Sequence, residues 1–487
     1  MSRSLRRVRR GSLAAALVAC WTSGWAGLVA PTRRIDAKVD LDSVDQRIDG
    51  FGGINFPRWI PDLTPEQADL AFGTDPGRIG MSLLRIGISP DSSEWGLEIP
   101  TARRAVARGV RVFASPWSPP ARMKTNGKVV RGELLDSARP AYARHLAAFA
   151  RFMADSGVPL AGISIQNEPD IEPDYESCGW TPASIREFLR RDGGAIPVPI
   201  IASEASGFDK AYTDSVLTDS VAASRIAIVG THIYGTAPSP YPAARAAGKP
   251  LWMTEHYTSS DRGANLWPDA LEVGKEIHAC MVSGFSAYVW WYIRRFYGPV
   301  TDDSRVSKRG WNIAHFARYV RPGAWRLKGP GSLAPGVMAT AYRKDDTVVV
   351  VAIDDGDSDV ELRLRLEGSR GIPRVFSRRT TSADRDFAWD GRIPVEGDRL
   401  TIALTARSIT TLVSPPEPSP DEWPRTVARP EPGRWDVFAL GGPRTGNLGP
   451  APAAGAGAAL ARIVSRPGIY LLRSEAGGDP MLVAVPK

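Results

Sequence analysis

Two glutamates stand at or near the ends of apolar runs typical of buried strands. Glu168 ends the run LAGISIQNE (residues 160–168), and Glu255 lies near the end of PLWMTEHY (residues 250–257). One carboxylic acid that donates a proton and one carboxylate that attacks carbon, about 5 Å apart, can cleave a glycosidic bond with retention of configuration. An isolated glutamate at a strand end is more often an ion-pair partner or a helix cap. The hypothesis therefore requires both residues to face one site.

A third glutamate, Glu204, ends the run PIIASEAS (residues 199–206) in the same way. Its position alone does not exclude it from the reacting pair. Asn167, directly before Glu168, is placed to donate a hydrogen bond to a sugar hydroxyl. Pro169 follows and turns the chain out of the strand.

The glutamates belong to a regular series of predicted strands. Short apolar runs alternate with amphipathic helical stretches between residues 48 and 295, which predicts a closed (β/α)8 TIM barrel of the α/β class. The strand runs are residues 48–55, 82–89, 110–117, 160–168, 199–206, 226–234, 250–257 and 286–295. Barrels of this kind hold their sites at the C-terminal ends of the strands. Those ends carry Arg85, Trp117, Glu168, Glu204, His232, Tyr234, Glu255 and Arg295.

A chain of 487 residues is too long for one compact core and predicts further domains. After residue 320 apolar and polar residues alternate, with turns at Asp345-Asp346 and Asp355-Gly356, as in antiparallel sheets. Residues 36–50 alternate similarly and add a strand. We expect a barrel over residues 49–320 and a β-sandwich side domain over residues 34–48 and 321–414. A Pro-rich linker (415–433) and a small C-terminal module (434–487) follow.

The N-terminal segment (residues 1–33) is typical of an export signal, with an Arg-rich start and an apolar run from Leu13 to Ala19. Leu17 to Cys20 also resembles a bacterial lipobox, so lipidation of Cys20 and ordinary cleavage further on both remain open. No later run reaches the ~18 apolar residues that span a membrane. We expect an exported monomer that is secreted or held at the cell surface by lipid alone.

Other chemistries find little support in the sequence. It has no GxSxG, GxxxxGK[ST], GxGxxG or HExxH motif, and its five histidines never fall at a metal-ligand spacing. We predict no metal and no cofactor. The net charge of +8 comes mainly from scattered arginines, which argues against nucleic-acid binding. A disulfide between Cys178 and Cys280 is not favoured, because they lie far apart on a predicted loop and helix.

Seven motifs, in order, make the chain resemble glycoside hydrolase family 30, most closely its glucuronoxylan endo-xylanase subfamily. The similarity runs from about residue 36 to 415. The motifs are GFGGINF, LLRIGIS, ASPWSPPARMKTNG, SIQNEP, THIYG, MTEHY and WWYIRRFYGPVTDDSRVSKRG. The resemblance implies a retaining mechanism with Glu168 as acid/base and Glu255 as nucleophile, and it ranks Glu204 lower.

The resemblance also implies substrate-binding positions. Arg85 would brace the nucleophile, since a guanidinium keeps a carboxylate ionised. Positions that line the sugar site are Trp117, Asn167, Tyr175, His232 and Tyr234. Positions that grip a glucuronate branch, which an arginine can bind through two hydrogen bonds, are Tyr257, Ser260, Trp291, Arg295 and Tyr297. Strand alternation puts Trp290 and Trp291 on opposite faces.

Two residues depart from the subfamily pattern. Phe296 stands where a small hydroxyl residue is usual, and Ile171 replaces an aromatic residue. Strict dependence on glucuronate is therefore less secure than xylan cleavage. The expectation is an endo-β-1,4-xylanase acting on glucuronoxylan. The alternatives are another family 30 β-glycosidase, a branch-independent xylanase, or a non-catalytic carbohydrate-binding protein of the cell surface.

Overall fold

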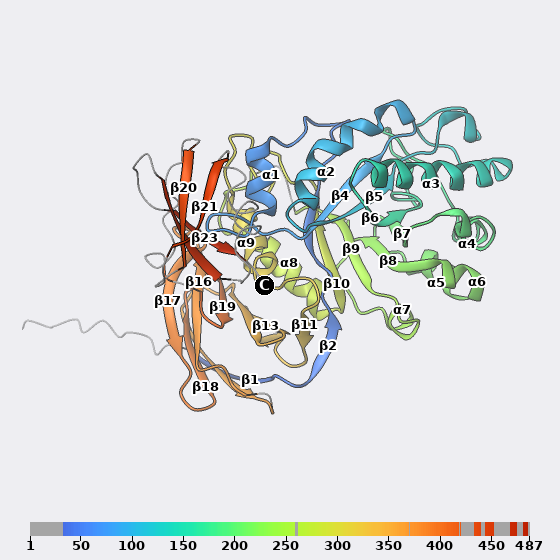
Figure 1. The fold of residues 1–487 in the computed structure, drawn as a ribbon. Coiled ribbons are helices and arrows are strands. Elements are labelled where there is room, and N and C mark those ends of the chain that lie inside the picture. The colour runs from blue at the N-terminus through green and yellow to red at the C-terminus, as the bar shows by residue number, and fades with distance from the viewer. Residues whose placement is uncertain are drawn as a thin grey trace, which may run out of the picture.

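The computed structural model describes residues 33–258, 262–369, 371–417 and 419, and the backbone of four strands between residues 433 and 485. Figure 1 shows a barrel surrounded by helices on one side and stacked sheets on the other. The predicted export segment up to residue 32, with Cys20, lies outside the described residues. Ser260 and most of the predicted linker lie outside them too.

The barrel is closed by eight parallel strands in the order β10-β3-β4-β5-β6-β7-β8-β9. They are β3 (Gly50–Ile54), β4 (Leu83–Ile88), β5 (Arg111–Pro116), β6 (Leu160–Ser164), β7 (Ile200–Ala205), β8 (Ile226–His232), β9 (Leu251–His256) and β10 (Phe285–Trp290). Each predicted apolar run contributes one of them, which confirms the barrel. Several strands end earlier than predicted: β10 stops at Trp290 rather than at residue 295, and β6 stops at Ser164 rather than at residue 168.

Helices cover the outside of the barrel (Figure 1). They are α1 (Pro65–Phe72), α2 (Ile99–Val106), α3 (Arg139–Asp155), α4 (Pro182–Arg191), α5 (Lys210–Leu217), α6 (Ser220–Arg225), α7 (Pro242–Ala246), α8 (Leu271–Val282) and α9 (Lys308–Ala317). Short 3-10 helices span Ser92–Glu98, Ala121–Met123, Asp136–Ala138 and Gly193–Ala195. The starts of α1 and α4 are fixed by capping boxes at Thr64 and Thr181, each followed by a proline.

The inside of the barrel changes from apolar to polar toward its C-terminal mouth. A buried apolar cluster fills the lower part: Leu83, Phe113, Ile201, Ile228, Trp252, Ala287 and Val289. Inward positions along a strand are two residues apart, so Arg85 follows Leu83 and Ser115 follows Phe113 as the next inward layer. The buried layer therefore forms an apolar floor beneath the polar residues.

The side domain consists of two sheets. One has the order β1-β15-β18, and the other has the order β17-β16-β19-β14-β13-β11-β2, with β12 paired to β13. The strands are β1 (Arg33–Asp40), β2 (Val44–Arg47), β11 (Trp325–Leu327), β12 (Ser332–Ala334), β13 (Val337–Lys344), β14 (Thr347–Asp354), β15 (Val360–Glu367), β16 (Val375–Thr381), β17 (Ala388–Pro394), β18 (Arg399–Leu404) and β19 (Ser408–Ser414). A shared apolar core lies between the sheets, so the predicted sandwich is confirmed.

The segment before the barrel was predicted to add one strand to the side domain. It adds two, β1 to the smaller sheet and β2 to the larger one. The pairing of β1 with β15 is parallel, whereas the alternation had predicted antiparallel sheet. Alternation shows that a strand has one buried face but carries no information about the direction of its neighbour. β2 pairs antiparallel with β11 and leads directly into β3 of the barrel.

A buried histidine joins the barrel to the side domain. His315 of α9 contacts the Thr411 hydroxyl of β19 through Nδ1 at 2.8 Å and the Thr381 hydroxyl of β16 through Nε2 at 2.9 Å. Burial, with Arg379 adding to it, holds the pKa of His315 well below its usual value. These contacts give His315 a structural role between the helix and the sheet.

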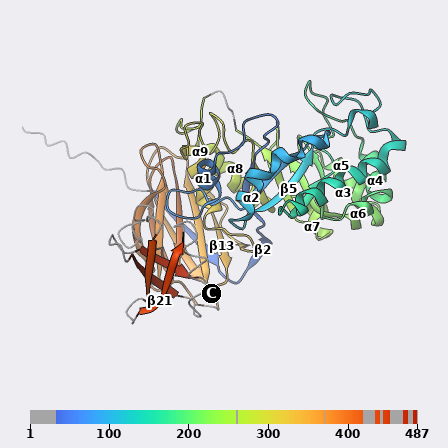
Figure 2. The same ribbon diagram turned by 45° about the horizontal axis from the view of Figure 1, so that its top comes forward.

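Strands β20 (Gly433–Ala439), β21 (Arg444–Ala451), β22 (Gly468–Ser474) and β23 (Met481–Val485) form a separate antiparallel sheet in the order β21-β20-β22-β23. In both views it lies on the side of the molecule away from α3 to α6 (Figure 2). Cys178 and Cys280 are both buried and free, as predicted. None of the described helices is long and apolar enough to cross a membrane.

Candidate active site

The stretch after β6 carries the first candidate catalytic residue. The ladder of β6 ends at Ser164, yet the backbone N–H of Asn167 still donates to Pro116 O at 2.8 Å. The N–H of Glu168 then donates to Glu204 O at 3.1 Å. Glu168 thus lies in a loop held between the neighbouring strands β5 and β7, which fixes its carboxylate at the mouth.

The backbone bends at each of the three glutamates. Glu168 and Glu204 have φ angles of 47° and 56°, in the left-handed region that residues other than glycine rarely adopt. In β9 the pairing with β8 shifts register so that His232 faces Glu255. Such bulges re-aim side chains. These bends turn three side chains toward one point.

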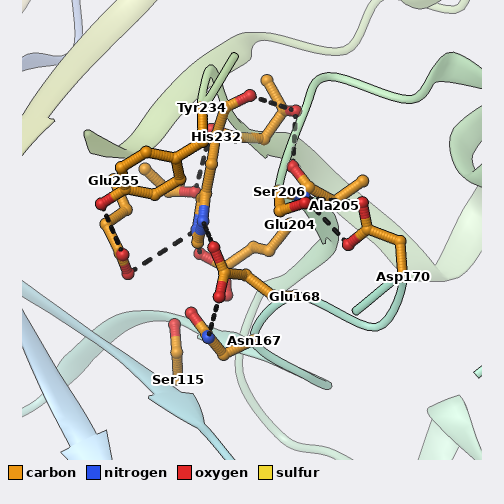
Figure 3. Close-up of polar contacts among 12 residues, drawn as sticks. Ser115, Asn167, Glu168, Asp170, Glu204, Ala205, Ser206, His232, Tyr234 and Glu255 are labelled. Atoms are coloured by element: carbon orange, nitrogen blue, oxygen red, sulfur yellow. Dashed lines mark hydrogen bonds and ion pairs between the residues drawn. The ribbon is translucent and has the colours of Figure 1, made fainter. Parts of the chain in front are cut away.

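Glu168 and Glu255 face each other across a short gap (Figure 3). One oxygen of each carboxylate and one ring nitrogen of His232 lie within 4.8 Å of one another. The His232 ring stands between the acids, with Nδ1 3.1 Å from Glu168 Oε1 and Nε2 3.9 Å from Glu255 Oε2. The gap is close to the separation of about 5 Å found in retaining glycosidases.

Arg85 holds this group together from beneath. Its side chain is fully buried, and Nη1 forms a close ion pair with Glu255 Oε2. Nη2 donates to Asn167 Oδ1 at 2.7 Å and to Glu204 at 3.3 Å. Nε donates to Ser115 Oγ at 3.1 Å. One guanidinium thereby fixes groups from β5, β7, β9 and the loop after β6.

Burial distinguishes Glu204 from the other two glutamates. The side chain of Glu204 is 0% exposed, whereas those of Glu168 and Glu255 are each 7% exposed. Burial alone would raise the pKa of Glu204, but the charges of Arg85 and His232 outweigh it and lower that pKa to about 2. Glu204 is a permanent anion beneath the site and offers no surface to a substrate.

Neighbouring groups shift the pKa values of the two facing acids, Glu168 and Glu255. Burial raises the pKa of Glu255 and the charge of Glu168 adds to it, while His232 and Arg85 oppose the rise. For Glu168, burial is outweighed by hydrogen bonds from His232 and Tyr175, so its pKa is lowered. Burial would lower the pKa of His232, but the surrounding carboxylates raise it to about 9. At neutral pH the hydrogen-bonded pair His232–Glu168 therefore holds one proton.

Hydroxyl groups and a further acid complete the polar shell. The Tyr234 hydroxyl donates to Glu255 Oε1 at 2.9 Å, and the Tyr175 hydroxyl donates to Glu168 Oε2 at 3.1 Å. Asp170, which sequence reasoning missed, accepts the backbone N–H and the hydroxyl of Ser206 at 2.9 Å (Figure 3). These last bonds tie the Glu168 loop to the end of β7.

Comparison with known proteins identifies the family. A model described as the glycosyl hydrolase family 30 TIM-barrel domain matches residues 87–246. The glucuronoxylanase XynC of Bacillus subtilis (strain 168) is 41% identical over 389 residues, which span 78% of this chain and 91% of that protein. The chain belongs to glycoside hydrolase family 30.

Solved structures agree with this assignment. The family 30 enzyme is similar to a subfamily 8 xylanase of Clostridium acetobutylicum, at 33% identity and a TM-score of 0.73. It is also similar to a family 30 endoxylanase of Clostridium papyrosolvens C71, at 32% identity and a TM-score of 0.71. Each comparison covers 78% of this chain and 99% of the other. The resemblance stated from the motifs is confirmed, and the protein is a glycoside hydrolase.

An aromatic wall lines one side of the family 30 site. The Trp117 ring stacks on Phe56 at 4.8 Å between centroids and lies 5.9 Å from Trp291. Trp59 contacts Trp117 and also Tyr175, at 5.3 and 5.7 Å. Trp117 is almost completely covered, so the partly exposed rings of Trp59, Trp291 and Tyr175 are the ones open to a sugar. Trp59 was missed, although FPRWI directly after the first barrel strand could have indicated it.

A second aromatic group surrounds Arg295. Its guanidinium lies over the rings of Tyr292 and Tyr297, at 5.2 and 5.9 Å, and no described carboxylate pairs with it. Tyr297 stacks on Tyr257 at 5.2 Å, and Tyr257 lies 5.7 Å from Tyr234, the tyrosine that donates to Glu255. The structure thus brings every described candidate residue to one mouth. Trp290 is buried while Trp291 is partly exposed, as alternation predicted.

Within the described residues, Glu168, His232 and Glu255 are spaced closely enough to hold a metal ion. Arg85 already pairs with Glu255, and His232 carries a proton at neutral pH, so two positive charges oppose a cation there. The donor set therefore does not fit a resident metal. The expectation that the enzyme needs no cofactor remains a prediction.

Arg85 gives the first testable prediction. Arg85→Leu would remove one of the two positive charges beside the buried Glu204 and Glu255, which should lower the free energy of unfolding by about 3–5 kcal/mol. The double variant Arg85→Leu/Glu204→Gln should regain part of that loss, because one buried charge is removed. Urea denaturation followed by fluorescence measures both.

A matched control is Arg108→Leu, since Arg108 pairs with the half-exposed Asp69. Its effect should stay within about 1 kcal/mol. An Arg85→Leu protein as stable as the wild type would contradict the role assigned to Arg85.

Proposed function

We propose that this protein is a retaining endo-β-1,4-xylanase that cleaves xylan carrying glucuronic acid branches. The observation that carries the proposal is the gap of at most 4.8 Å between the Glu168 and Glu255 oxygens at the barrel mouth. A gap of this size leaves room for direct attack on carbon but not for a water molecule placed behind it. The similarity to a relative named as a glucuronoxylanase supports the choice of substrate.

In the first step a Glu255 oxygen attacks the anomeric carbon. The bond from that carbon to the glycosidic oxygen breaks, and Glu168 gives its proton to the leaving oxygen. The products of the step are a glycosyl ester on Glu255 and a shortened xylan chain. Arg85 and the Tyr234 hydroxyl support Glu255 as the nucleophile, because both donate to its carboxylate and favour the ionised form.

In the second step water attacks the same carbon from the side vacated by the leaving chain. Glu168, now ionised, takes a proton from the water, and the ester bond to Glu255 breaks. Two displacements restore the original configuration. His232 supports the proton-transfer role of Glu168, because its ring shares a proton with the Glu168 carboxylate at 3.1 Å.

Arg295 is the residue that we assign to the glucuronate branch. A guanidinium binds a planar carboxylate through paired hydrogen bonds, and Arg295 lacks a described carboxylate partner. Its neighbour Arg294 differs, since it donates to Asp302 at 2.7 Å and to Pro61 O at 2.9 Å. Phe296, which is 54% exposed, supplies an apolar surface where a hydroxyl would otherwise assist. The N-terminal segment further supports action outside the cell.

The two catalytic roles can be separated by substitution. Glu255→Gln should reduce turnover by several orders of magnitude on every substrate, because no ester can form. Glu168→Gln should be equally poor on xylan but should still form the glycosyl enzyme from an aryl xylobioside whose leaving group needs no proton. Mass spectrometry of the trapped ester distinguishes them.

Circular dichroism should give wild-type spectra for both variants. Proton NMR of the first product formed should show the β-anomer. Activity of Glu255→Gln within a few fold of wild type, or an initial α-anomer, would contradict the proposed mechanism.

Recognition of the branch gives a separate prediction. Arg295→Ala should lower kcat/KM on glucuronoxylan by about 10- to 100-fold, because the charge-assisted hydrogen bonds to the branch carboxylate are lost. Unbranched xylo-oligosaccharide should be affected far less. Arg294→Ala is the matched control and should leave the ratio of the two activities unchanged. Equal losses of Arg295→Ala on both substrates would indicate a branch-independent xylanase.

The raised pKa of His232 predicts how activity depends on pH. The wild-type enzyme should lose activity as pH rises through the pKa of His232, raised to about 9, because the His232–Glu168 pair then loses its proton. In His232→Asn the proton must stay on Glu168 alone, so the alkaline limb of kcat/KM should move to lower pH. A pH profile with an unchanged alkaline limb would show that His232 serves only to pack the site.

A further inference from the structure

Trp325 is an exposed tryptophan far from the catalytic mouth. Among the tryptophans whose side chains the structure describes, it alone is exposed, at 41%. It lies on β11, which sits between β13 and the short edge strand β2 (Figure 1). An exposed tryptophan presents an apolar face to solvent, against which the apolar face of a ligand can pack.

Arginines lie on both sides of Trp325 across the sheet. Trp325 pairs with Arg47 of β2 and with Arg343 of β13. Residues paired across antiparallel strands point to the same face, so the three side chains form a row, Arg47–Trp325–Arg343. The next residue, Arg326, points to the opposite face and pairs with Asp45 at 2.7 Å.

Two cavities meet at this row. A cavity of about 660 Å³ is lined by Arg47, Trp325 and Arg343 together with Val44 and Lys344. A second cavity of about 620 Å³ shares Arg47 and Trp325 with the first. Trp325 and Arg47 therefore border both hollows, an arrangement that suits a chain molecule extending from one hollow to the other. The two neighbouring hollows are called the groove below.

The second cavity locates the groove at the base of the barrel. Its lining includes Asp49, Pro250 and Ser286, which lie at or just before the starts of β3, β9 and β10. The catalytic residues lie at the opposite ends of the barrel strands. A chain segment bound along the row is thus out of reach of Glu168 and Glu255.

The lining of the two cavities carries both signs of charge, and five cations exceed four acids. The cations are Arg47, Arg245, Lys249, Arg343 and Lys344, and the acids are Asp42, Asp45, Asp49 and Asp345. Arg47 has no ion-pair partner among the described residues, and the nearest carboxylate to Arg343 is that of Asp42, at 3.8 Å. Lys344 Nζ donates only to a backbone carbonyl, Pro322 O, at 2.9 Å. The guanidinium of Arg47 is therefore free to pair with a carboxylate of the ligand.

We propose that the row Arg47–Trp325–Arg343 is a second, non-catalytic binding site for polysaccharide bearing uronic acid groups. A sugar ring stacks on Trp325, and Arg47 binds a uronate carboxylate. The inference rests on the proposed function for its choice of polymer. The site holds the enzyme on the polymer while the mouth at the other end cleaves, which raises the effective concentration of cleavable bonds.

The test uses the full chain with Glu255→Gln, so that the polymer is not cleaved during binding. Adding Trp325→Ala should weaken retention on insoluble glucuronoxylan by about 5- to 10-fold, the loss of one stacked ring. Trp325→Phe should keep most of the retention, because it restores an aromatic face. Arg47→Ala should weaken retention on glucuronoxylan but not on the same xylan stripped of its uronic acid.

Arg399→Ala is the matched control, since Arg399 is a highly exposed arginine on the other sheet of the side domain. It should leave retention unchanged. In the background with an intact Glu255, Trp325→Ala should hydrolyse a short soluble glucuronate-bearing oligosaccharide at the wild-type rate and insoluble glucuronoxylan more slowly.

Two outcomes would overturn the inference: undiminished retention of Trp325→Ala, or equal losses on the soluble and insoluble substrates. Failure of the proposed function is recognised separately. In that case the wild-type enzyme itself does not cleave the soluble glucuronate-bearing oligosaccharide, whatever the behaviour of the Trp325 variants.

Discussion

The buried guanidinium of Arg85 is the interaction on which the site depends. Three glutamates and a histidine crowd into one dry region, and like charges at such short range could not coexist without a counter-ion. Arg85 provides it from β4, through contacts with Glu255, Glu204 and Asn167. The network is buried, and the apolar floor of the barrel lies beneath it. Burial strengthens each contact, and it also means that the loss of any one partner strongly lowers the stability of the fold.

Glu204 supplies the negative charge that offsets the buried positive charge of Arg85. As a fully buried anion it compensates Arg85 and helps to raise the pKa of His232 to about 9. His232 can then carry a proton in contact with Glu168 while Arg85 remains engaged with Glu255. A fully buried carboxylate thus influences the protonation of the groups that face each other at the mouth. The lowered pKa of Glu168 and the raised pKa of Glu255 arise from burial and from these neighbours, since the two carboxylates themselves are chemically identical.

The sequence predicted the barrel well because its signals are local. Each apolar run became a strand, and residues at the C-terminal ends met at one mouth by the geometry of parallel strands. What escaped prediction depends on the backbone conformation of single residues. The left-handed φ angles of Glu168 and Glu204 have no signature in residues that usually avoid them. Strand position alone could not separate Glu204 from the facing pair either, because the difference between them is one of burial.

Other features escaped because they join segments distant in sequence. Trp59 reaches the site only because the loop after β3 folds over Trp117, and β1 runs parallel to a strand more than three hundred residues later. The row around Trp325 has the same origin, since β2, β11 and β13 each contribute one residue. A polar-apolar pattern indicates that each strand has an outer face, but only the assembled sheet places an indole between two guanidinium groups. The two ends of the barrel therefore differ. At the mouth the charged side chains are buried, as a reacting group of acids requires, whereas at the base Trp325 and Arg47 are exposed. An exposed ring and an exposed cation suit binding of a polymer rather than its cleavage.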